Sequence, residues 1–157
     1  TLPAMQLDDN PFADWSCQLF TVDRTQYIIV SNTKSLYSCV LYGQGITNDY
    51  PFIERVLSSL RQFMEDDGQS FIYRTFIAPS SAVHLATALN RSVTASMNDL
   101  IGHAIGWLEY GAIAPHDLGF RLNDILLSTL AASKSAKYGK PNDAFQLLAD
   151  AYPPSVV

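Results

Sequence analysis

Residues 90–99 hold the densest run of side chains that could perform chemistry. An Arg guanidinium binds phosphate or carboxylate through two parallel hydrogen bonds, and a neighbouring hydroxyl or amide can position the bound group. Asp99 and His103 are four residues apart, so on a helix they would be neighbours able to act as an acid–base pair. We therefore predict a site for a small anionic ligand. Its ligand-binding residues are Arg91, Ser92 and Asn98, and its candidate catalytic residues are Asp99 and His103.

The same segment also fits a local role at the start of a helix. Ser96 is followed three residues later by Asp99, which predicts a capping box between the two side chains and each other's backbone N–H groups. A helix over residues 97–109, ending at Gly111, follows from this start. Its apolar stripe consists of Met97, Leu100, Ile101, Ala104 and Leu108.

Two interpretations of this segment remain open. Backbone amides at a helix start attract anions, and Arg91 beside them favours a functional site. However, Ser, Asn and Asp also favour caps and turns for purely local reasons, which favours a structural role. Gly102 and Gly106 lie inside the expected helix and lower its stability.

The elements expected around this segment define the fold class. Residues 15–22, 26–30 and 35–42 are three strand-like runs separated by turn residues. Strands joined by tight turns form an antiparallel meander. We therefore predict an α+β fold in which an antiparallel β-meander packs against several α-helices in a single domain spanning residues 1–157. Residues 1–14 are expected to be a lead-in segment and residues 152–157 a C-terminal tail.

Helical periodicity dominates the rest of the chain. Asn48 or Asp49 is expected to cap a helix that Asp67-Gly68 ends. Residues 69–77 fit both a strand and a helix, whereas residues 83–89 alternate like a strand. Asn142 is expected to cap a last helix. Another helix is predicted after Pro115, with Leu118, Leu122, Ile125, Leu126 and Leu130 facing inward.

Composition and charge exclude several functional classes. The net charge of −5 argues against binding to duplex nucleic acid, which needs a basic face. No apolar run of about 18 residues predicts a membrane span, and no signal peptide is visible, so we expect a cytoplasmic protein. The three histidines are scattered and no Cys-x-x-Cys motif occurs, so we predict no metal and no cofactor. Cys17 and Cys39 are expected to be buried free thiols.

Several short motifs carry a family resemblance. They are Asp14-Trp15, Leu19-Phe20-Thr21, Asp23-Arg24, Asn90-Arg91-Ser92-Val93, Ser96-Met97-Asn98-Asp99-Leu100, Leu122-Asn123-Asp124-Ile125, and Tyr138 with Pro141. Over residues 15–148 the chain resembles a family of small uncharacterised prokaryotic proteins, a domain of unknown function. The resemblance favours a helix over residues 69–77 and supplies no activity, so it assigns no catalytic residue.

Three functional hypotheses follow. The first is a binding or regulatory module that acts through a protein partner, because no recognisable catalytic set is present. The second is an enzyme that acts on a phosphorylated or nucleotide-like substrate at residues 90–99. The third is binding of single-stranded nucleic acid by exposed aromatic side chains of the meander and by the lysines of residues 134–140. The aromatic side chains in question are Trp15, Phe20, Tyr27 and Tyr37.

Overall fold

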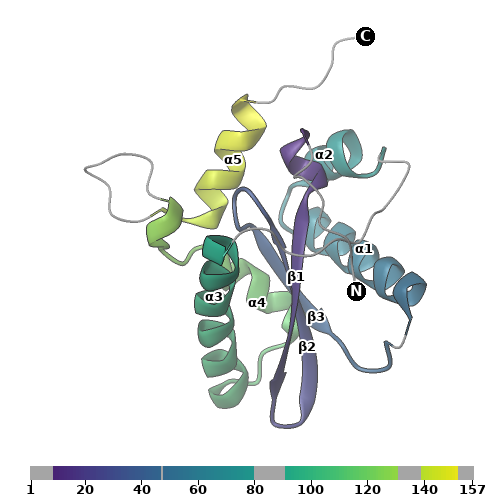
Figure 1. Cartoon of the computed structure of the whole chain (residues 1–157), viewed down its shortest axis with the longest axis vertical. Helices are drawn as coiled ribbons and strands as arrows, with labels where there is room; N and C mark the ends of the chain where they lie inside the picture. The colour runs from purple at the N-terminus through teal and green to yellow at the C-terminus, as the bar shows by residue number, and fades with distance from the viewer. Residues whose placement is uncertain (1–8, 47, 80–90, 131–138, 152–157) are drawn as a thin grey trace.

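Three antiparallel strands form the centre of the fold. The computed structural model describes residues 9–46, 48–79, 91–130 and 139–151. β1 (Trp15–Val22), β2 (Thr25–Asn32) and β3 (Ser38–Tyr42) pair in the order β1-β2-β3, so β2 lies in the middle of the sheet (Figure 1). The predicted α+β class and the antiparallel meander are therefore confirmed.

Both turns of the meander use left-handed backbone. Asp23 and Arg24, between β1 and β2, have φ of 48° and 68°. Two such residues form a type I′ turn, whose twist matches that of the two strands it joins. In the second turn the buried Leu36 has a φ of 63°. This conformation interrupts the extended chain, so β3 begins at Ser38 and the expected start of the third strand at residue 35 was wrong.

Helices cover both faces of the sheet, so the molecule has three layers (Figure 1). One face is covered by α1 (Asp49–Asp66), by α5 (Pro141–Ala151), and by α2 (Ser70–Ile72), which continues into the π-helix η2 (Tyr73–Ile77). The other face is covered by α3 (Arg91–Tyr110), and α4 (Pro115–Leu122) lies along β3, where it packs against both α3 and α1. Two short 3-10 helices are η1 (Pro11–Ala13) and η3 (Ser128–Leu130).

Alternation along β2 builds a core on each side of the sheet. Ile28 and Val30 belong to the cluster on the α1 side, whereas Ile29 belongs to the cluster on the α3 and α4 side. Successive side chains of a strand point to opposite faces, so a central strand with helices on both sides buries both sets. Phe12 of η1 is fully buried and stacks on Phe76 with ring centroids 4.7 Å apart. The expected lead-in segment therefore contributes to the core.

The sequence predicted most of the helices correctly, but several of their first or last residues were wrong. α1 is confirmed, although Asn48 precedes it without a side-chain capping bond, and residues 70–77 are helical rather than extended. α4 stops at Leu122, and Leu126 is 57% exposed, so the longer helix that would have buried Leu126 was wrong. α5 begins at Pro141, which places Asn142 inside the first turn instead of at the cap.

The strand expected over residues 83–89 lies outside the described residues. Within the described part of the chain, no helix is long and apolar enough to cross a membrane.

Candidate functional site

α3 starts earlier than its sequence pattern predicted. It is helical from Arg91, so residues 96–99 lie in its second and third turns and their backbone N–H groups are not at a helix end. Ser96 points inward, is 3% exposed, and shares a hydrogen bond of 2.9 Å between its Oγ and Thr129 Oγ1. The predicted capping box was therefore wrong. A Ser whose hydroxyl bonds to a residue from a distant segment has the same sequence signature as a cap.

The five predicted site residues all lie on the solvent-exposed side of α3. Arg91 and Asp99 are separated by about 12 Å along the axis, since each helical residue adds about 1.5 Å. Asp99 and His103 are one turn apart, and no hydrogen bond or ion pair joins them in the described part of the chain. Asn98 Oδ1 accepts a hydrogen bond of 2.8 Å from Gln18 Nε2 of β1. The ligand-binding and catalytic roles assigned to these side chains, Ser92 included, stay predictions.

We call the outward-pointing side of this helix the α3 face. Its residues are Arg91, Ser92, Ala95, Asn98, Asp99, Gly102, His103, Gly106, Glu109 and Tyr110. Gly102 and Gly106 lie one turn apart near its middle, and a Cβ added at either would meet no atom within 4 Å. A mid-helix Gly costs about 1 kcal/mol relative to Ala. Packing among the residues that the structure describes does not account for that cost at these two positions.

The charges at the ends of α3 are also unfavourable for an isolated helix. The first turn holds no acidic residue and the last turn no basic one; instead Arg91 lies at the start and Glu109 near the end. The N-terminal end of a helix carries partial positive charge and the C-terminal end partial negative charge, so each misplaced charge costs about 0.3–1 kcal/mol. No ion pair joins Arg91 or Glu109 to another residue that the structure describes.

A buried polar network at the turn between β2 and β3 was not foreseen from the sequence. Asn123, at the end of α4, accepts from the Ser38 N–H at 2.8 Å and donates to the Ser38 carbonyl at 3.0 Å. Asn32 Oδ1 accepts from both the N–H and the hydroxyl of Ser35. Among the described residues, no buried side-chain N or O atom lacks a partner. The network is therefore explained by folding, and its sequence signal was the Asn123-Asp124 pair in the family motif.

Two further polar contacts gather where α1 ends against α4. Tyr37 donates to Asp67 Oδ2 at 2.5 Å, and His116 Nε2 lies 2.8 Å from Asp66 Oδ2. Burial raises the pKa of Asp67, the Tyr37 hydrogen bond opposes that rise, and the nearby Asp124 adds to it. Burial also raises the pKa of Tyr37 far above its usual range. These contacts link elements of the fold, and no group of three or more His, Cys, Asp or Glu side chains suited to a metal occurs in the described ranges.

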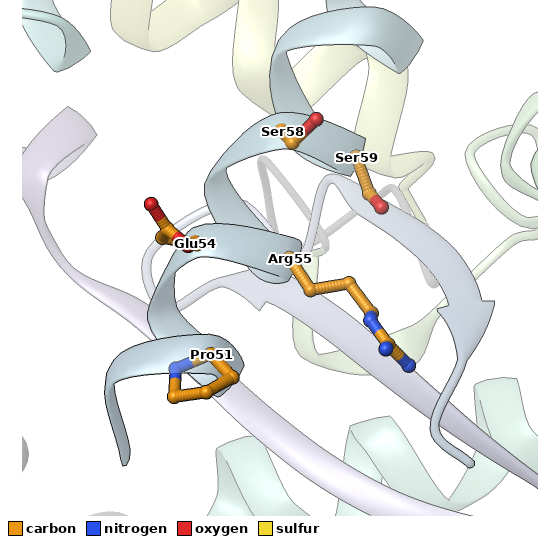
Figure 2. Close-up of a pocket in the computed structure, with 5 residues that line it drawn as sticks. All are labelled: Pro51, Glu54, Arg55, Ser58 and Ser59. Carbon is orange, nitrogen blue, oxygen red and sulfur yellow. The ribbon is translucent and has the colours of Figure 1, made fainter. Parts of the chain in front are cut away.

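A shallow hollow runs along the exposed side of α1, as Figure 2 shows. It has a volume of about 380 Å³ and is lined by Pro51, Glu54, Arg55, Ser58 and Ser59. Arg55 and Ser59 point to one side of the helix and Glu54 to the other. Arg55 Nη1 donates to the Gln44 carbonyl at 2.6 Å. Binding pockets usually enclose most of their ligand, and this hollow is open to solvent.

The residues expected to bind single-stranded nucleic acid are mostly enclosed. Phe20 and Tyr27 are each 8% exposed and Tyr37 is fully buried, so these rings cannot stack on bases. Lys134 and Lys137 lie outside the described residues. Cys39 is a buried free thiol as expected, whereas Cys17 is free but exposed, so the prediction for Cys17 was wrong.

Comparison with known proteins gives a family and no function. Residues 1–144 match a family described as a domain of unknown function, DUF6933. Because the match covers more than half of the chain, the protein belongs to this family. No curated protein and no solved structure matches the chain.

Proposed function

We propose that this member of a family of unknown function is a binding or regulatory module that acts through a protein partner, and that the α3 face contacts that partner. The observation that carries the proposal is the open middle of this face at Gly102 and Gly106. Gly allows another backbone to approach closely. The two Gly residues lower the stability of α3, and close contact with another protein at this surface would offset that loss.

Two residues at the ends of the α3 face also support protein binding. They are Arg91, whose residue type is enriched at protein interfaces, and Tyr110, which is 91% exposed. Aromatic side chains, Tyr among them, are enriched where proteins contact one another. By contrast, an enzyme that acted through Arg91 and Asp99 would need a concave site to bring a substrate between them, and these residues lie on the convex outer side of one helix.

Site-specific photocrosslinking tests the proposal. We would place p-benzoylphenylalanine at Tyr110 of the full chain and, as a matched control, at Tyr50, an exposed tyrosine on α1 across the sheet. We expect irradiation in cells that naturally make the protein to give a discrete protein adduct from position 110 and none from position 50. Absence of an adduct at position 110, or equal adducts at both positions, would remove the α3 face as the contact surface.

A further inference from the structure

The charges of the α3 face are complementary to those of a second, identical α3 face that runs antiparallel to it. Arg91 lies in the first turn and Glu109 in the last, close to equal distances from the middle of a helix that runs Arg91–Tyr110. When two such helices pack antiparallel about their midpoints, Arg91 of one copy lies within one residue of the height of Glu109 of the other. Two-fold symmetry then gives two such Arg91–Glu109 contacts, one at each end of the helix pair, as in any interface between identical surfaces.

We infer that the partner of the α3 face is a second copy of this chain, and that the two α3 helices pack antiparallel across a two-fold axis. This inference rests on the proposed function, because it names the partner of the same surface. The charges at the two ends of α3 identify this partner.

The misplaced end charges of α3 become favourable in this arrangement. Arg91 lies at the positive end of its own helix but beside the negative C-terminal end of the second copy, next to that copy's Glu109. Glu109 lies correspondingly beside the positive N-terminal end of the second copy. A parallel pair would instead place Arg91 against Arg91 and Glu109 against Glu109. The charge pattern therefore selects the antiparallel orientation.

The middle of the α3 face fits the same register. Ala95 of one copy lies level with Gly106 of the other, and Asp99 lies level with Gly102 and within one residue of the height of His103. Small residues at these heights leave room for the two backbones to approach, since a Cβ at Gly102 or Gly106 would meet no described atom beyond the adjacent backbone of its own helix. The acidic Asp99 lies closer in height to the imidazole of His103 in the other copy, about one residue away, than to the carboxylate of Asp99 there, about three residues away. The same register therefore places opposite charges together at the ends of the two helices and small residues together near their middle.

The contact is modest in size. Each copy contributes one helix of 20 residues, and a single helix pair buries less than the roughly 1,200 Å² found at the low end of stable interfaces. We therefore expect a dimer that dissociates on dilution and weakens as salt is added, because charged contacts are screened.

Charge reversal gives a test in which misfolding does not mimic the result. Arg91→Glu and Glu109→Arg each place like charges opposite one another in the dimer, yet each improves the match to the helix dipole in the monomer. By sedimentation velocity on the full chain, we expect each single variant to weaken self-association by at least about tenfold. The double variant restores opposite charges, and we expect it to return to within about threefold of the original. Arg61→Glu on the exposed side of α1 serves as the control and should change nothing.

A steric variant probes the middle of the contact. Gly102→Leu favours the helix but fills the gap between backbones, so self-association should be lost. Ser58→Leu, an exposed position on α1, is its control and should leave self-association intact. A dimer that survives both Gly102→Leu and the single charge reversals would have its interface elsewhere and would overturn the inference.

The outcomes separate the inference from the proposed function. If the purified chain stays monomeric up to about 1 mM, a concentration that would reveal very weak association, the inference fails. If position 110 nevertheless crosslinks to a different protein in cells, the proposed function stands without it. If the chain is monomeric and position 110 gives no adduct, both fail. An adduct from position 110 with the mass of two chains, lost in Gly102→Leu, supports both.

Discussion

Replacing Asn123 by Ala tests how strongly the start of β3 depends on one side chain. Asn123 is 1% exposed and joins the end of α4 to Ser38 through two hydrogen bonds, one accepted at 2.8 Å and one donated at 3.0 Å. The Ser38 N–H and carbonyl point away from β2, and the Asn123 amide takes the place that a further strand would have. The variant removes both partners at once.

The expected cost follows from the burial of Ser38, which is completely enclosed. A buried donor or acceptor that loses its partner costs about 1–3 kcal/mol, so two such groups give about 2–6 kcal/mol. The Ser38 hydroxyl already bonds to Ser31 and to the Leu36 carbonyl, so it cannot take over. A loss of this size is a large fraction of the roughly 5–15 kcal/mol that stabilises a typical domain.

Urea unfolding followed by circular dichroism measures this loss directly. Asn142→Ala is the matched control, because Asn142 also bonds through its amide, but to the exposed Asp124; we expect a change within about 0.5 kcal/mol. Asn123→Asp keeps one acceptor and loses the donor, so it should regain stability as the pH falls and the carboxyl takes up a proton. A loss below about 2 kcal/mol in Asn123→Ala would refute the reasoning that Ser38 has no other partner.

Three further predictions concern the packing of α4 and the end of α1. Gly119→Ala should destabilise the fold by about 1–3 kcal/mol in urea unfolding, because its Cβ would lie 2.6 Å from Cζ of the buried Phe63 ring; Gly102→Ala, with open space, should instead stabilise a monomeric sample by up to about 1 kcal/mol. Tyr37→Phe keeps the ring stacked on Phe145 but removes the bond to Asp67, and should cost about 1.5–3 kcal/mol by the same assay, as a bond to a charged group does. Burial raises the pKa of Asp67 in the folded state, so the native protein holds its proton to higher pH than the unfolded chain and loses stability as the pH rises from about 4 through that raised pKa. Asp67→Asn should therefore gain stability relative to the original protein over that pH range and level off above it; parallel curves for the two proteins would contradict this.

The strands and α1 could be predicted because their signals are local. β1 matches its expected bounds at both ends, since alternation and the Asp23-Arg24 turn lie within one hairpin. The start of β3 could not be predicted, because it depends on the left-handed Leu36 and on Asn123, which lies 85 residues from Ser38. Contacts over such separations leave no periodicity in the sequence.

The residues predicted to form the site lie on α3, but the local geometry expected for them was wrong. The polar residues from Arg91 to Asp99 suggested a turn followed by a cap, because Ser, Asn and Asp favour both. The helix instead continues through them, and Ser96 bonds to Thr129 from another segment. The sequence therefore identified exposed polar side chains of α3 but could not show that they share one convex surface.

Some residues of this chain adopt a backbone conformation, or occupy a helix position, that their residue type disfavours, and they are of two kinds. Leu36 adopts a left-handed conformation that costs a branched residue about 1–2 kcal/mol, but its side chain is buried in the core and its N–H bonds to the Asn32 carbonyl at 2.8 Å, so the fold offsets the cost. Gly102, Gly106, Arg91 and Glu109 also depart from what a stable helix prefers, yet nothing in the described chain offsets them. Natural sequences keep uncompensated departures mainly where function requires them. Four of them share one face of α3, and the proposed contact of that face with a second chain would offset all four.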